Sequence, residues 1–200
     1  MKEIKKDSSL IKEDLNHMID NFLSYAIPRI SAIRRYNTRK FIIPQNDLEH
    51  MGSVAIIGML FSDYFNKIGI KNNTEKVMRL AITHDLDEAV TGDVPHDAKY
   101  QQGKRSETLR AALAQLSEIT MENMYDMIKH EDIRKKYMDL YLEEKERKSI
   151  ETKIVKLADL TDVIIYSESE MKLGNKIISV ERENAKKRFD DMLAQILAHK

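Results

Sequence analysis

The chain has 200 residues, the length of one ordinary domain, and we expect a single domain over residues 1–200. Hydrophobic residues make up 42% of the sequence and charged residues 33%, with six Gly, three Pro and no Trp, which is typical of a helix-rich soluble protein and argues against an all-β fold. The 33 basic residues balance the 33 acidic ones, so no overall positive field favours a nucleic-acid partner.

Cysteine is absent, which excludes disulfides, thiolate metal sites and cysteine nucleophiles. The longest apolar stretch, residues 54–61, is far shorter than a membrane span, and the N-terminal residues lack the apolar core of a signal peptide. We therefore expect a cytoplasmic protein without a membrane partner.

Apolar residues at helical spacing predict helices along most of the chain. In chain order the predicted helices cover residues 10–25, 48–65, 74–89, 149–168 and 178–197, with two or three more within 104–148. Pro28 ends the first helix or opens a second, and Gly92 and Pro95 break the third. Ser149 is a candidate N-cap and Gly174 a candidate stop. We expect an all-α bundle of about seven helices.

Ionisable residues fall inside or at the start of these apolar helices at His50, His84, Asp85 and Asp159. Buried polar groups need partners, and two imidazoles with two carboxylates suit one divalent metal ion such as Mn, Co, Fe, Zn or Mg. Such a set leaves coordination positions for water and substrate, which is typical of a catalytic site. Asp162, one turn after Asp159, is the alternative carboxylate if the helix is rotated.

Glu88 is the candidate general acid or base. On a continuous helix over residues 74–89 it follows His84 by four residues and Asp85 by three, which places it on the same face and within reach of a metal-bound water. The alternative is a structural carboxylate that pairs with an Arg or Lys.

The loop over residues 91–95 brings Asp93 towards the mouth of the same pocket. There Asp93 takes part in catalysis, bonds a sugar hydroxyl or caps the loop. Lys99 and Arg35 are the candidate contacts for a substrate phosphate. Arg35 belongs to a basic run whose other members are typical of a solvated surface.

Three motifs carry a family resemblance. The run H-D-x-x-E-x-x-T-G-D-x-P that begins at His84, the E-H pair that ends at His50 and the K-L-A-D run that ends at Asp159 resemble the signature of the HD-domain metal-dependent phosphohydrolases. The likeness to the YfbR-like 5′-deoxynucleotidases covers about residues 30–180 and adds Arg35-Tyr36, Lys99-Tyr100 and Gly174-Asn175.

This resemblance implies an all-α HD domain that removes phosphate from deoxyribonucleoside 5′-monophosphates, usually as a homodimer. It also implies one divalent metal ion, a water-activating role for Glu88, and Asp93 and Arg35 at the substrate. The residues that match the metal ligands are His50, His84, Asp85 and Asp159. Tyr36 stands where members of the family carry a Trp linked to discrimination against the ribose 2′-hydroxyl, so the preference between deoxyribose and ribose is open.

We therefore predict a metal-dependent phosphomonoesterase that hydrolyses nucleoside 5′-monophosphates. Glu88 orients or deprotonates the water or protonates the departing 5′-oxygen, Arg35 and Lys99 hold the phosphate, and Tyr36 borders the sugar. One alternative is an HD phosphohydrolase of nucleoside triphosphates, cyclic dinucleotides or alarmones, although the sequence shows no second basic cluster for a triphosphate. The other is a catalytically silent helical module that acts as an interaction surface and holds no metal.

Overall fold

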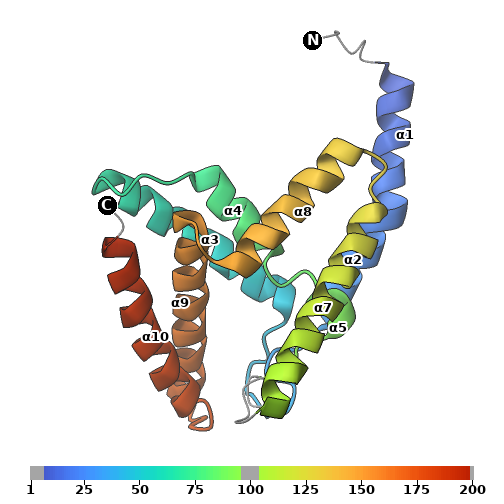
Figure 1. Ribbon diagram of the computed structural model, residues 1–200. Helices are drawn as coiled ribbons and strands as arrows, with labels where there is room; N and C mark the ends of the chain where they lie inside the picture. The colour runs from blue at the N-terminus through green and yellow to red at the C-terminus, as the bar shows by residue number, and fades with distance from the viewer. Residues whose placement is uncertain (1–6, 96–103, 199–200) are drawn as a thin grey trace.

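The computed structural model describes residues 7–95 and 104–198, and all regular elements within them are helices (Figure 1). The predicted all-α fold is thereby confirmed. The elements are α1 (Ser8–Met18), a π-helical turn η1 (Ile19–Leu23), α2 (Ser24–Ala32), α3 (Asp47–Lys67), α4 (Thr74–Thr83), α5 (Glu88–Thr91), α7 (Lys104–Asp126), α8 (Glu131–Glu146), α9 (Ile150–Lys172) and α10 (Ser179–Leu197). Among the described helices, none has the length and apolar character needed to cross a membrane.

Helix α3 is the central element, and a capping box fixes its start. The Asn46 side chain accepts the backbone N–H of Glu49, and the Glu49 carboxylate accepts the backbone N–H of Asn46. Two of the donors that a helix start leaves unpaired are thus satisfied locally. The cap sets where α3 begins and therefore where its first turn places the residues that follow.

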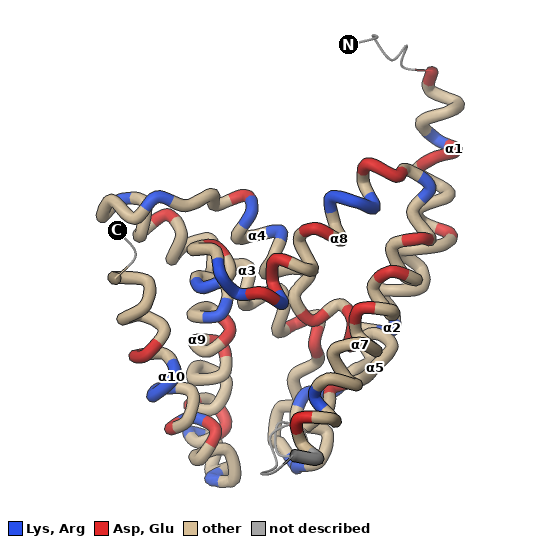
Figure 2. Tube along the Cα trace, in the orientation of Figure 1, with Lys and Arg blue, Asp and Glu red and all other residues tan. Residues whose placement is uncertain are grey.

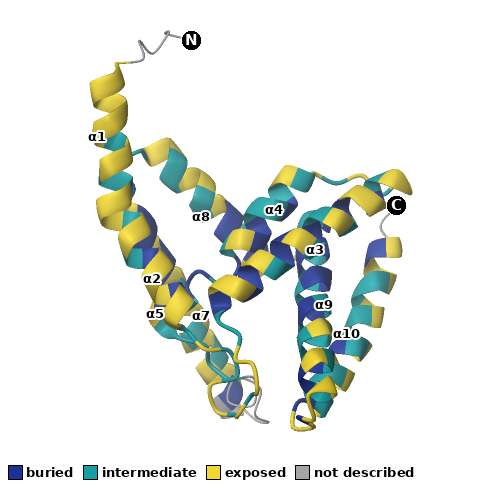
Figure 3. Cartoon of the chain, turned by 180° about the vertical axis from the view of Figure 1, so that it is seen from behind, coloured by how far each residue is buried: buried dark blue, intermediate teal, exposed yellow. Residues whose placement is uncertain are grey.

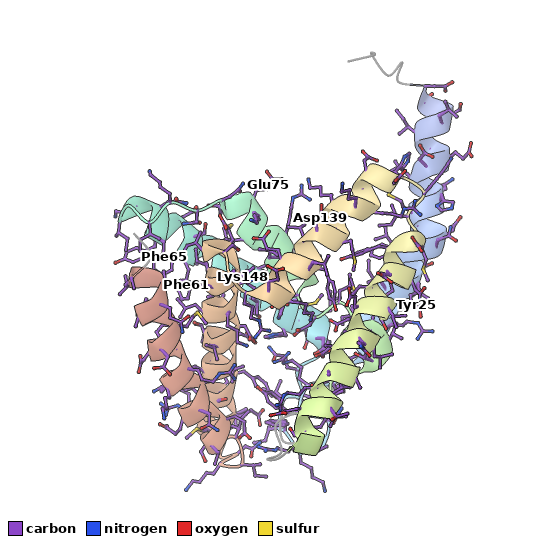
Figure 4. All side chains as sticks on the ribbon, viewed as in Figure 1. Tyr25, Phe61, Phe65, Glu75, Asp139 and Lys148 are labelled. Carbon is purple, nitrogen blue, oxygen red and sulfur yellow. The ribbon has the colours of Figure 1, made fainter. Side chains whose placement is uncertain are left out.

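A first apolar cluster forms where α3 packs against α4 and α9, with Val54, Leu80 and Leu157 buried at its centre. Phe61 and Phe65, labelled in Figure 4, join this cluster from α3, and α10 packs along α9. Figure 3 shows the buried positions gathered where α3, α4 and α9 meet.

A second apolar cluster lies on the other side of α3. It joins Met51 of α3 to Ile30 of α2 and to Met121 and Tyr125 of α7. Helices α9 and α10 thus stand on one side of the molecule and α2, α5 and α7 on the other, with α3 reaching between them (Figure 1). His50, which precedes Met51, lies buried between the two clusters.

The predicted helix over residues 74–89 is broken, which corrects the sequence interpretation. Helix α4 ends at Thr83, residues 84–87 form turns with backbone bonds to the third residue before, and α5 begins at Glu88. The ring Nδ1 of His84 lies 2.8 Å from the Ala81 carbonyl, which a continuing α-helix gives to the N–H of Asp85. The His84 side chain therefore competes with the helix backbone for the Ala81 carbonyl, and α4 ends here.

The N-cap and the stop that the sequence predicts for α9 are confirmed. Ser149 caps α9 by accepting the N–H of Thr152, and Gly174 follows the last turn of α9 with a φ of 99°. Such a positive φ favours glycine because a Cβ would clash with the backbone.

Gly58 is the point of closest approach in the first cluster. A Cβ there would lie 3.2 Å from Val77 Cγ1 and 3.7 Å from Ala158 Cβ. We expect Gly58→Leu to lower the free energy of unfolding by about 1–3 kcal/mol, because the added atoms force α4 and α9 away from α3. Chemical denaturation followed by circular dichroism measures the change.

Gly52 of the same helix is the matched control, since nothing lies within 4 Å of a Cβ built there. Gly52→Ala is expected to raise stability by about 0.5–1 kcal/mol through helix propensity alone. A Gly58→Leu protein as stable as the wild type would contradict the close approach of α4 and α9 to α3 at this residue.

Candidate metal centre and substrate pocket

His50, His84 and Asp85 lie together although they come from different elements. His50 belongs to the first turn of α3, while His84 and Asp85 follow the last residue of α4. One ligand atom from each lies within 4.8 Å of the other two. Asp85 Oδ2 is 3.1 Å from His84 Nε2 and 3.7 Å from His50 Nε2.

Asp159 reaches the same place from α9, with its Oδ1 3.4 Å from His50 Nε2. Of the four residues that the sequence selected as metal ligands, three form one cluster, and Asp159 adjoins it through His50. Their donor set of two imidazole nitrogens and carboxylate oxygens suits a divalent transition metal or magnesium.

The two imidazoles have defined orientations. His50 Nδ1 is 2.6 Å from a carboxylate oxygen of Asp162, and His84 Nδ1 is 2.8 Å from the Ala81 carbonyl. Both partners accept, so each Nδ1 carries the hydrogen and each Nε2 of a neutral ring offers a lone pair. Both Nε2 atoms are buried without a hydrogen-bond partner among the described residues. In their deprotonated form these two Nε2 atoms fit the ligand set of a metal ion, which would displace the proton that Asp85 favours on His84.

Strong electrostatic coupling acts between these groups. Burial disfavours the charge of His84, but the adjacent Asp85 carboxylate outweighs burial and raises the pKa of His84 to about 9. Burial likewise opposes the charge of Asp85, yet the imidazolium beside it lowers the pKa of Asp85. Burial also works against the charge of Asp159, but Lys156 and His50 hold its pKa well below the usual range. Both carboxylates are ionised at neutral pH, which is the form that binds a cation.

Asp159 and Asp162, left as alternatives by the sequence, lie against opposite edges of one ring. Asp159 approaches His50 at Nε2, whereas Asp162 lies at Nδ1 and also accepts a hydrogen bond from the Gln45 side chain at 3.2 Å. A carboxylate at Nδ1 fixes the ring orientation and raises the basicity of Nε2. Asp162 therefore orients the His50 ring from its Nδ1 edge, opposite the edge that Asp159 approaches.

A pocket of about 700 Å³ opens beside these four residues. It lies between the loop after α2, the turn around α5, and helices α9 and α10. The sequence-selected residues that line it are Arg35, Tyr36, Asp85, Glu88, Asp93 and Asp159. Lys99 lies outside the described residues.

Glu88 reaches the pocket by a route different from the one expected. It opens α5 and does not share a helix with His84, so the prediction of a common helix face was wrong. The Glu88 N–H bonds to the Asp85 carbonyl at 3.0 Å, and this tight turn brings the Glu88 side chain to the pocket beside Asp85.

Asp93 holds the loop that carries Tyr36. Its Oδ2 accepts the backbone N–H of Tyr36 at 3.0 Å, and its carbonyl accepts the Asn37 side chain at 2.9 Å. Tyr36 has a φ of 54°, and its ring stacks on Tyr166 with centroids 6.0 Å apart. One oxygen of Asp93 thus keeps Tyr36 in a strained left-handed conformation at the pocket wall.

Two charged residues of the site escaped the sequence analysis. Lys156 pairs through Nζ with Asp159 Oδ2, and Asp47 lies fully buried near Arg35. Lys156 was detectable, because residues three apart on a helix share a face. Asp47 was not detectable, since nothing in the sequence reports its burial.

The family model described as 5′-deoxynucleotidase YfbR-like matches residues 21–198. The chain belongs to this family. Among named relatives, the 5′-deoxynucleotidase of Erwinia tasmaniensis is 27% identical over 179 residues, which cover 89% of this chain and 85% of that protein. The 5′-deoxynucleotidase YfbR of Shigella boydii is 28% identical over 152 residues, or 74% of this chain and 72% of that protein.

Solved structures share the fold. A conserved hypothetical protein of Pyrococcus furiosus has a TM-score of 0.66 at 26% identity, covering 90% of this chain and 94% of that one. An HD-domain phosphohydrolase of Listeria innocua has a TM-score of 0.69 at 20% identity, covering 95% and 90%. The HD phosphohydrolase of cyanophage S-2L, bound to dA and one catalytic Zn²⁺ ion, has a TM-score of 0.52 at 18% identity, covering 86% and 93%. The family match and its named relatives identify the protein as a hydrolase, and the solved structures show that it shares their fold.

Asp162→Asn tests the support of His50. We expect the affinity for Mn²⁺ to fall about 10–100-fold, because the carboxylate that orients the ring and raises its basicity is lost. Calorimetric titration of metal-free protein gives the dissociation constant. The control is Asp190→Asn, an exposed acid of α10. Equal Mn²⁺ affinity in the two variants would contradict this role of Asp162.

Proposed function

We propose that this protein is a metal-dependent phosphomonoesterase that hydrolyses ribo- or deoxyribonucleoside 5′-monophosphates to nucleoside and phosphate. The observation that carries the proposal is the cluster of His50, His84 and Asp85, with Asp159 next to His50, beside a pocket that Asp85, Asp159 and Arg35 line. Membership of the YfbR-like family and two relatives named 5′-deoxynucleotidases support this substrate class.

These four residues would hold one divalent metal ion, and Mn, Co, Fe, Zn and Mg are all compatible with the ligand set. The single catalytic Zn²⁺ of the cyanophage neighbour supports the proposal of one ion. When bound, such an ion polarises a phosphoryl oxygen and lowers the pKa of water.

The remaining chemistry belongs to residues of the chain. Glu88 takes a proton from the attacking water or gives one to the departing 5′-oxygen. Arg35 donates hydrogen bonds to the phosphate, and Lys99 adds a second cationic contact. Tyr36 borders the sugar. Asp93 bonds a sugar hydroxyl with the oxygen that the Tyr36 N–H does not use.

A second candidate, hydrolysis of nucleoside triphosphates, is favoured by one observation. The lining of the pocket also includes Arg147 at the end of α8 and Arg188 of α10, which are far apart in the sequence. Arg147 pairs through Nε with Glu144 at 3.2 Å. Both guanidinium groups would be available to a longer phosphate chain bound in this pocket.

A panel of nucleotides distinguishes the two candidate functions from each other and from a catalytically silent module. Release of inorganic phosphate is measured for ribo- and deoxyribonucleoside 5′-mono-, di- and triphosphates with Mn²⁺, Co²⁺, Zn²⁺ and Mg²⁺. We expect turnover of 5′-monophosphates and a metal requirement. Turnover of triphosphates alone would favour the second candidate, and no metal binding at all would favour the catalytically silent module.

Glu88→Gln tests the proton-transfer role. We expect kcat to fall about 10²–10⁴-fold while metal binding persists, since Gln keeps the shape of Glu but cannot accept or release the proton. The control is Glu122→Gln, an exposed acid of α7. Phosphate release by the Glu88→Gln protein at the wild-type rate would refute the assignment.

We propose a homodimer that covers the apolar stripe of the N-terminal helices. Helix α1 has no buried residue and extends away from the rest of the chain (Figures 1 and 3). Exposed side chains continue the stripe through η1 and α2 at Leu10, Leu15, Ile19, Leu23 and Ile27. Such a contiguous apolar surface is typical of an interface.

Light scattering tests the dimer. We expect a dimer mass for the wild type and a monomer for Leu15→Glu, because a charge in the stripe opposes its burial. Ile56→Glu is the control, since Ile56 is exposed on α3 away from the stripe. A monomeric wild type would contradict this assembly.

The cytoplasmic location and the lack of a nucleic-acid partner stay predictions. Figure 2 shows acidic and basic positions distributed along the same helices, α8 and α10 among them.

A further inference from the structure

A short antiparallel contact sets Arg35 beside Asp47. The Arg35 N–H donates to the Gln45 carbonyl at 3.1 Å, and the Asp47 N–H donates to the Ile33 carbonyl at 3.2 Å. Arg34 and Asn46 form the bridge between these two bonds. The loop between these segments is thus closed at its base, and Arg35 lines the pocket while Asp47 opens α3.

Asp47 is an unusual buried acid. Its side chain is 0% exposed, and neither oxygen accepts a hydrogen bond of normal geometry from a described residue. Glu88 faces it from α5. Burial raises the pKa of Asp47 to about 6, although Arg35 opposes this shift. An ionised carboxylate with so few partners destabilises a fold, so stability alone does not account for it.

The contact with Arg35 is an attraction without a hydrogen bond. Arg35 Nη1 lies 3.7 Å from Asp47 Oδ1, beyond the range of a charge-assisted hydrogen bond. A closer, bidentate pair would use two of the five guanidinium donors. At this distance Asp47 attracts Arg35 and leaves its donors for another acceptor.

Arg35 has a competing neighbour. Its Nη1 donates a long hydrogen bond of 3.5 Å to Oδ2 of Asp85, one of the three clustered residues His50, His84 and Asp85. Arg35 therefore lies between two carboxylates, one behind it at Asp47 and one at the centre. If Asp47 lost its charge, Asp85 would be the remaining acid that the described structure places within 4 Å of this guanidinium.

We propose that Asp47 is a positioning residue that competes with Asp85 for the Arg35 guanidinium and so limits its hydrogen bond to Asp85, which leaves the other donors of Arg35 directed to the substrate phosphate. This inference rests on the proposed function for the identity of the anion. It assigns to Asp47 a role in phosphate affinity that acts through Arg35, without contact between Asp47 and the substrate.

The direction in which phosphate affinity changes when Asp47 loses its charge distinguishes this role from a purely electrostatic one. Removal of a negative charge close to an anion site by itself strengthens anion binding. Loss of a group that positions the main phosphate donor weakens it. Asp47→Asn keeps the size of the side chain, removes its charge and replaces one acceptor oxygen by an NH2 group.

The experiment titrates inorganic phosphate into Mn²⁺-loaded protein at pH 8, where Asp47 is ionised. For Asp47→Asn we expect the Kd of phosphate and the KM of a deoxyribonucleoside 5′-monophosphate to rise about tenfold, the weight of one hydrogen bond to a charged group. The value of kcat should change less, and Tm should stay equal or rise. Glu168→Gln is the control, since it removes an equal charge from an ion pair with Arg182.

A double-mutant cycle tests whether Asp47 acts on phosphate affinity through Arg35. In an Arg35→Met background, Asp47→Asn should add no further change in phosphate affinity. Asp47→Leu, which fills the buried space without charge, replaces the Asn variant if the latter does not fold.

Unchanged or tighter phosphate binding in Asp47→Asn overturns the proposal, and so does an equal effect in the Arg35→Met background. A wild type that binds no phosphate also overturns it. A wild type that binds phosphate but hydrolyses no nucleotide refutes the proposed function and leaves the assignment of Asp47 standing.

Discussion

The buried imidazole of His50 is the constraint on which the site depends. Its Nδ1 is 2.6 Å from Asp162 of α9, and its Nε2 faces Asp85 and Asp159. Because both edges of the ring are engaged, α3 and α9 cannot slide past one another without breaking the site. The apolar packing around Val54 holds the same two helices together, so core and site stabilise one relative position.

A close gathering of carboxylates is the second feature of the pocket. Asp47, Asp85 and Asp159 converge from three parts of the chain, and Arg35, Lys156 and the His84 imidazolium are the cations beside them in the described structure. Gathering like charges in a region of low dielectric costs stability. A bound divalent cation offsets this repulsion, which is why a site that is unfavourable for folding alone is favourable for metal binding.

Helix α9 also controls the loop that carries the substrate-facing side chains. Glu170, buried near its C-terminus, accepts the backbone N–H groups of Ile42 and Ile43 at 2.9 and 2.7 Å, and the Asn175 side chain donates to it at 2.7 Å. The same helix supplies Asp159. One helix therefore sets the position of Asp159 at its middle and the position of the loop at the pocket wall near its end.

The sequence by itself determined the helical class, most helix ends and the residue types of the centre, because helical periodicity, the Ser149 cap and the Gly174 stop are local properties. It did not determine the break at His84, where a side chain takes a helix carbonyl. Nor did it separate Asp159 from Asp162, or reveal that Asp47 is buried. The roles of Asp159 and Asp162 depend on how α3 and α9 cross, and the burial of Asp47 depends on the packing around the start of α3. Contacts between residues 112 positions apart are decided by packing in three dimensions, which no local pattern records.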